Sequence, residues 1–343
     1  MVVFGAGASY DSVPSRRPHA KSPILSRPPL ANELFADRPL FVEMLERFPA
    51  CQPIVPYLQN LQPTQSVEGL LEELQAATAT YPRGTIQLAA VRYYLQSMLG
   101  RCESDWEREA ARGITNYKTL LDQIERFRRP DEPVLLVTFN YDSMLERALG
   151  PFGVTIRSLA DYVSNDVYKI IKLHGSVNWG RLVTVPAVDK TILLGKDDWS
   201  LANDLIDHAA TLQVSDRYYF QYQIPMTKAE GNTIIPALAI PLQKKQSYEC
   251  PAEHLEVLKT VLPRVRRLLI IGWRATDRPF LELLRGDGRH AYDCLVVVGG
   301  TEPAREVMAN IREAGIPTSQ RPPGAGGFTD FILQHEGDAL FRS

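Results

Sequence analysis

The sequence has few of the features that mark secreted, membrane or metal-binding proteins. It has only four cysteines, Cys51, Cys102, Cys250 and Cys294, and none forms a CxxC pair or a Cys/His cluster with zinc-site spacing. No apolar run approaches the roughly 20 residues of a membrane span, and the first residues lack the basic region of a signal peptide. We therefore expect a cytoplasmic protein with free thiols, no metal and no membrane partner.

The sequence also lacks a dominant charge. Its 38 Lys and Arg residues are interspersed with 40 Asp and Glu residues, which leaves a formal net charge of −2. Because no strongly basic face is implied, direct binding of nucleic acid is not favoured. The hydrophobic content of 45% is that of a globular chain able to bury a sizeable core.

The period of the apolar residues divides the chain into two kinds of region. After a proline-rich stretch over 11–30, apolar residues recur at helical spacing, as in Leu88, Val91, Leu95 and Met98. We read such stripes as packing faces and not as a ligand-binding box. We therefore predict one domain over 1–343, with a helical insertion over 32–129.

Outside that block, short β-branched and apolar runs alternate with helical patterns, which is typical of a parallel sheet. We predict a Rossmann-like open parallel sheet with helices on both faces (α/β class), whereas the order of elements within 180–235 stays open. The predicted strands are 2–4, 134–139, 168–173, 234–240, 268–272 and 294–299, and the predicted helices are 142–149, 252–262, 278–284 and 303–314.

Three of these strands end in residues suited to dinucleotide chemistry. Gly5-Ala6-Gly7-Ala8-Ser9 follows the first strand, Asn140 the second and His174 the third. Each has an ordinary interpretation alone: a tight turn, an Asx turn or helix cap, and a structural histidine. Because the carboxyl ends of parallel strands meet at one sheet edge, where α/β folds bind ligands, their joint occurrence favours a shared site.

A glycine turn, an asparagine and a histidine can bind NAD and attack its ribose. The bond from nicotinamide to ribose already carries a cationic leaving group, so no general acid is needed, unlike in ordinary glycosides. Asn140 can orient a water or a ribose hydroxyl, and His174 can accept the proton near neutral pH. Asp142 has two readings: holding the nicotinamide amide or ribose, or favouring the start of the following helix.

The three segments resemble the sirtuin-like family, in its glycine-rich turn, its T-x-N-x-D segment and its His-Gly. The match runs from Gly5 to about Phe331. The resemblance implies a catalytic pair, a phosphate-binding turn and contacts along the adenosine half. By position these are Asn140 and His174 for catalysis, Gly5, Ala6, Gly7 and Ser9 for the phosphates, and Gly272 and Asp277 for the adenosine half.

Further segments resemble the bacterial branch of this family that is associated with antiphage defence. They are Pro29–Phe35, Lys244 with Ser247–Tyr248, Ile270–Trp273 with Asp277, and Gly326–Phe328 with Phe331–Ile332. The chain departs from deacylating sirtuins, because it cannot build their four-cysteine zinc module and carries Trp273 and Arg274 where they have small hydroxyl residues. The resemblance therefore implies water as the acceptor, in an NAD hydrolase that depletes NAD when triggered.

Such an enzyme must be held inactive until it is needed. The resemblance implies a homo-oligomer, with a separate sensor or activator such as a HerA-like ATPase or an Argonaute-like protein. Two alternatives stay open: a non-catalytic sensor of NAD or ADP-ribose, and an NAD-dependent protein deacylase or ADP-ribosyltransferase. The sequence decides neither the trigger nor the preference between NAD and NADP.

Overall fold

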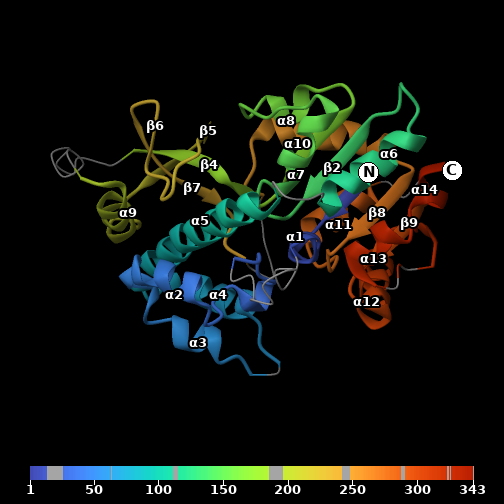
Figure 1. Cartoon of the computed structure of the whole chain (residues 1–343). Coiled ribbons are helices and arrows are strands. Elements are labelled where there is room, and N and C mark those ends of the chain that lie inside the picture. Colours follow the sequence, from blue (N-terminus) through green and yellow to red (C-terminus); the bar gives the residue numbers. More distant parts are fainter. Residues whose placement is uncertain are drawn as a thin grey trace.

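The centre of the molecule is a six-stranded parallel sheet with the strand order β10-β9-β8-β1-β2-β3. This is a computed structural model, which describes residues 1–13, 26–62, 64–110, 115–184, 196–241, 248–286, 290–322, 324 and 326–342 (Figure 1). The predicted Rossmann-like sheet is confirmed. Its strands are β1 (Val2–Phe4), β2 (Val134–Thr138), β3 (Tyr168–Lys172), β8 (Arg267–Ile271), β9 (Tyr292–Val297) and β10 (Thr318–Gln320).

The central strands β1 and β2 are buried along their whole length because helices cover the sheet. Every residue of β2 is buried, as expected of a parallel strand between two helical layers. The centroid of the Phe4 ring lies 5.2 Å from that of Tyr117 and 6.5 Å from that of Phe328. Tyr117 lies in α6 (Asn116–Phe127) and Phe328 in α13 (Gly327–Leu333), whereas α8 (Asp161–Ser164) and α10 (Ala252–Val261) pack against β3. The remaining helices of this part are α1 (Ala6–Ser12), α7 (Met144–Ala148), α11 (Arg278–Arg285), α12 (Thr301–Glu313) and α14 (Asp338–Arg342).

The predicted insertion over 32–129 does consist mainly of helices, and most of it packs around a second hydrophobic core. Its helices are α2 (Pro39–Glu46), α3 (Val55–Gln59), α4 (Val67–Ala76) and α5 (Arg83–Ala110). Figure 1 shows α2, α3 and α4 gathered beside α5, apart from the six-stranded sheet. The last helix of the predicted range behaves differently, because Tyr117, Leu120 and Leu121 of α6 are buried in the core of the sheet. The domain boundaries stay a prediction, and the packing groups α6 with the sheet.

A second, antiparallel sheet accounts for much of the region whose order the sequence left open. Its strand order is β5-β4-β7-β6, with β4 (Gly175–Thr184), β5 (Gln213–Phe220), β6 (Lys228–Ala229) and β7 (Asn232–Leu238), and α9 (Asp198–Asp207) lies between β4 and β5 in sequence. The strand predicted at 234–240 is β7, and it pairs antiparallel with β4 instead of joining the parallel sheet. Within 180–235 the sequence also has a strand-like apolar run at 191–194, which lies outside the described residues.

All four cysteines are free thiols, and all four are buried. Burial raises the pKa of the Cys102, Cys250 and Cys294 thiols to about 12, so they stay protonated at neutral pH. Within the described ranges no helix combines the length and the apolar character that crossing a lipid bilayer requires.

Candidate functional site

A cavity of about 740 Å³ opens where β1, β2 and β3 end, beside the loop that follows β8. The structure brings eight of the nine predicted site residues to its wall and leaves only Gly7 off it. The eight are Gly5, Ala6, Ser9, Asn140, Asp142, His174, Gly272 and Asp277. The sequence-based expectation that the strand ends share one site therefore holds in three dimensions.

The glycines bring α1 very close to the loop after β8. Gly272 has a φ of +63°, and a Cβ built on it would lie 2.3 Å from the backbone nitrogen of Ala8. The amides of Gly5 and Gly7 donate to Ile271 O at 3.0 Å and to Gly272 O at 3.1 Å. These glycines are thus required for close packing, and both amides are already bound to carbonyl groups. Their contact with phosphate stays a prediction.

Two hydroxyl groups, those of Ser9 and Tyr117, bind the side chain of Asn140. Its side-chain Nδ2 donates to Ser9 Oγ at 2.9 Å and to Tyr117 Oη at 3.2 Å, and the two hydroxyls lie 2.9 Å apart. Asn140 is 6% exposed and Ser9 is 2% exposed. Because the amide nitrogen is engaged, the carbonyl Oδ1 is the acceptor that Asn140 has to offer a ligand. The hydroxyl of Ser9, predicted to bind phosphate, is engaged in positioning Asn140.

His174 forms a pair with Asp277. The distance from His174 Nε2 to Asp277 Oδ2 is 3.1 Å, and the two side chains are 14% and 8% exposed. Asp277 also caps α11, because its Oδ1 accepts a hydrogen bond from Phe280 N at 3.1 Å. A neutral imidazole that donates from Nε2 to a carboxylate has an acceptor at Nδ1. Asp277, predicted to lie along the adenosine half, thus directly contacts the predicted catalytic histidine.

Aromatic rings support His174 and fix its plane. The ring of Phe139 meets the imidazole edge-on at 4.8 Å and stacks on Trp273 at 5.0 Å, and Phe280 packs against both aromatic residues. Trp273 is 5% exposed. The bulky residue at this position therefore lines the cavity and stacks on Phe139, the ring that contacts His174.

Asp142 lies just before α7 and is buried. Its Oδ1 accepts a hydrogen bond from Met144 N at 3.1 Å, which supports the helix-start reading, and its place on the cavity wall keeps the ligand reading open. Burial raises the pKa of Asp142 to about 6, although the nearby Lys172 ammonium lowers it in part. Lys172 itself is buried, contacting the backbone carbonyl of Asp142 and lying 2.9 Å from Glu146 Oε1.

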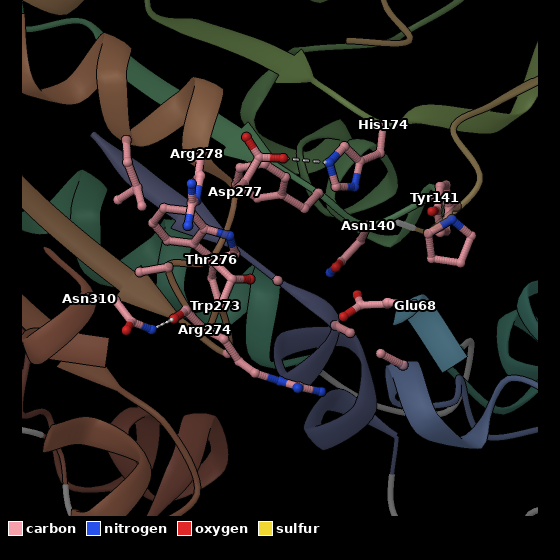
Figure 2. A pocket seen from close by; sticks show the side chains of 18 of the residues that line it. Glu68, Asn140, Tyr141, His174, Trp273, Arg274, Thr276, Asp277, Arg278 and Asn310 are labelled. Carbon is pink, nitrogen blue, oxygen red and sulfur yellow. Dashed lines mark hydrogen bonds and ion pairs between the residues drawn. The ribbon is translucent and has the colours of Figure 1, made fainter. Parts of the chain in front are cut away.

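Several residues of the cavity wall carry no sequence motif. Figure 2 shows Glu68 of α4, Arg274 and Thr276 of the loop after β8, Arg278 of α11 and Asn310 of α12 around the cavity that Asn140 and His174 line. Arg274 follows a recognised segment, but nothing in the local pattern singles out the others, because their helices read as ordinary amphipathic elements. These unpredicted wall residues include Glu68, Thr276, Arg278, Arg285, Asn310 and Glu313.

Comparison with known proteins finds one family model and several solved structures that are similar to this chain. Residues 134–290 match the family model described as the SIR2-like domain. Similar solved structures include a complex of a Sir2 homologue with NAD, at 15% identity and a TM-score of 0.42, covering 99% of this chain and 89% of that one. A mutant Sir2 homologue bound to 2′-O-acetyl ADP ribose has 13% identity and a TM-score of 0.43, with coverage of 99% and 89%. No curated protein sequence matches the chain.

Proposed function

We propose, on the premise that residues 134–290 form a SIR2-like domain, that the protein hydrolyses NAD to ADP-ribose and nicotinamide. The observation that carries this proposal is that Asn140 and His174 line the same cavity. Each side chain is held in place by a hydrogen bond, Asn140 to Ser9 and His174 to Asp277. A site that merely binds a nucleotide needs neither an oriented histidine nor an oriented amide.

The reaction uses what these two side chains offer. The bond between ribose C1′ and the nicotinamide nitrogen breaks, and its electron pair neutralises the pyridinium. A water oxygen forms the new bond to C1′ and transfers its proton to His174 Nδ1, while the Asp277 carboxylate stabilises the imidazolium. Asn140 Oδ1 accepts a hydrogen bond from the water or from a ribose hydroxyl and so sets the direction of attack.

Arginines supply the positive charge that a pyrophosphate requires. Arg274, Arg278 and Arg285 all line the cavity, and Figure 2 shows the first two with their guanidinium groups beside it. Guanidinium groups bind phosphate through paired, charge-assisted hydrogen bonds. This supports a dinucleotide whose phosphates lie toward α11 and whose nicotinamide ribose lies toward Asn140.

Water as the acceptor is supported by the departures from deacylating sirtuins. The four thiols are divided between two hydrophobic cores, with Cys51 and Cys102 in that of the insertion and Cys250 and Cys294 in that of the sheet. Trp273, where those enzymes carry a small hydroxyl residue, stacks on Phe139, whose ring contacts that of His174. The insertion contributes one wall of the cavity through Leu34, Glu68 and Leu99.

The wider proposal is that this NAD hydrolase acts in the cytoplasm as an antiphage effector, which depletes NAD and aborts the infection. Its support is the resemblance of several segments to that branch of the family, among them Pro29–Phe35, whose first residue lines the cavity. Lys244 and Ser247, part of the same resemblance, lie outside the described residues. Control by homo-oligomerisation, or by a separate HerA-like ATPase or Argonaute-like protein, belongs to the same proposal.

The test is to measure NAD, ADP-ribose and nicotinamide in cells that express the protein with its genomic neighbours during phage challenge. Wild type is compared at matched expression with Asn140→Ala and His174→Ala. His208→Ala is the matched control, because His208 lies at the end of α9 and bonds the backbone of Asp204. We expect NAD to fall and both products to appear with wild type and the control, and with neither site variant. Stable NAD during intact protection would overturn hydrolysis in favour of a sensor.

A further inference from the structure

Glu68 is the carboxylate that the helical insertion brings to the cavity. It lies in the first turn of α4, whose cap Ser66 accepts a hydrogen bond from Gly69 N at 3.1 Å. Next to it, Val67 is fully buried and donates its N–H to Asn32 Oδ1 at 3.3 Å. The start of α4 is thus anchored on both sides of Glu68, which holds this residue at the wall.

The carboxylates nearest the proposed chemistry are otherwise engaged. Asp142 accepts from Met144 N, and Asp277 binds both His174 and the start of α11. In the part of the chain that the structure describes, Glu68 forms no hydrogen bond or ion pair. Figure 2 shows its carboxylate pointing into the cavity across from Asn140.

The charge of Glu68 acts on the proposed catalytic edge of the sheet. Burial raises the pKa of Tyr141 above its usual range, and the negative charge of Glu68 raises it further. Tyr141 directly follows Asn140 in the chain, and the centroid of its ring lies 6.3 Å from that of the His174 ring. The field of Glu68 therefore reaches the place where the nicotinamide ribose lies in the proposed function.

We propose that Glu68 is a further catalytic residue of the NAD hydrolysis proposed above, on which this inference rests. As the C1′–nitrogen bond breaks, positive charge moves from the pyridinium onto C1′ and the ring oxygen of the ribose. A carboxylate facing that centre stabilises the cation, as carboxylates do in glycoside hydrolysis. Glu68 forms no covalent bond and takes no proton, since the proton of the attacking water goes to His174.

Ligand binding tests this role without requiring turnover. NAD carries a cationic pyridinium, whereas the dihydronicotinamide ring of NADH is neutral. In a His174→Ala background, which prevents consumption of the ligand, we expect calorimetry to show NAD binding about tenfold tighter than NADH. Adding Glu68→Gln should reduce that ratio to within about twofold. Glu73→Gln is the control, because Glu73 is exposed on the same helix and should leave the ratio unchanged.

Kinetics of the otherwise unaltered protein complete the test. We expect Glu68→Gln to raise KM about fivefold, in line with its weaker binding of NAD, and to lower kcat about 10- to 100-fold. Glu68→Asp should recover part of both losses, and Glu73→Gln should match wild type. A Glu68→Gln variant with unchanged kcat and an unchanged NAD-to-NADH ratio overturns the assignment. If wild type hydrolyses no NAD yet Glu68→Gln abolishes the binding preference, the proposed hydrolysis fails while the placement of Glu68 against the cationic ring stands.

Discussion

Replacing Asp277 by Asn removes one charge and leaves the shape of the site nearly unchanged. Asp277 Oδ1 accepts from Phe280 N at 3.1 Å, so the Asn variant keeps its carbonyl oxygen there to cap α11. Its amide nitrogen then faces His174 Nε2, where a carboxylate oxygen stood at 3.1 Å. A donor at that place favours the tautomer protonated at Nδ1, which cannot accept a proton from water.

The magnitude follows from the geometry of the pair. A full carboxylate charge about 3 Å from an imidazolium, at an effective dielectric of about 20–40, contributes about 3–5 kcal/mol. Both side chains are largely shielded, with 14% and 8% exposure, so the interaction is only partly screened. We therefore expect Asp277→Asn to lower kcat by about 10²–10⁴-fold and to leave the melting temperature within about 2 °C of wild type.

The assay is NAD hydrolysis at saturating substrate, followed by the release of nicotinamide, beside thermal unfolding of the same preparations. Asp277→Ser is the companion variant, because serine keeps a helix cap but does not reach the histidine. Glu282→Gln, on the same helix and on the cavity wall, controls for the loss of a negative charge nearby. A kcat of Asp277→Asn within twofold of wild type would refute the view that the carboxylate maintains the reactive histidine.

Two further predictions concern the supports of the site. Burial raises the pKa of Asp142 to about 6 in the folded protein, whereas the pKa of an aspartate in an unfolded chain is about 3.9. Between these two pH values the folded state binds more protons than the unfolded state, so the protein loses stability as the pH rises. Chemical denaturation should show that the free energy of unfolding of wild type falls by roughly 1–1.5 kcal/mol between pH 5 and 7.5, whereas that of Asp142→Asn lacks this fall. Parallel pH profiles of the two proteins would contradict this prediction. Gly272→Ala should destabilise by about 3–5 kcal/mol in thermal unfolding, since its Cβ would lie 2.3 Å from Ala8 N at a φ of +63°. The control Gly153→Ala, at a φ of +78° with open space around it, should destabilise the protein by only about 1 kcal/mol. Equal destabilisation by the two substitutions would show that the backbone conformation, and not the close approach to Ala8, causes the loss.

The site could be predicted in part because its main residues follow strands. Asn140 and His174 come directly after apolar runs whose parallel pairing brings their ends to one edge. Partners from distant segments could not be predicted in this way. Tyr117 reaches Ser9 and Asn140 from a helix that reads as a packing stripe, and Asp277 reaches His174 from 103 positions away.

The sequence by itself determined the α/β class, the parallel strands and the presence of the helical insertion, because hydrophobic period and turn chemistry are local properties. Only the tertiary structure decided which helices cover the sheet, that β7 belongs to a second sheet, and that Glu68 of the insertion faces Asn140. Those outcomes depend on long-range packing between segments whose own patterns are ordinary. The same packing gives Ser9, Gly7 and Asp277 structural partners in addition to the ligand contacts predicted for them.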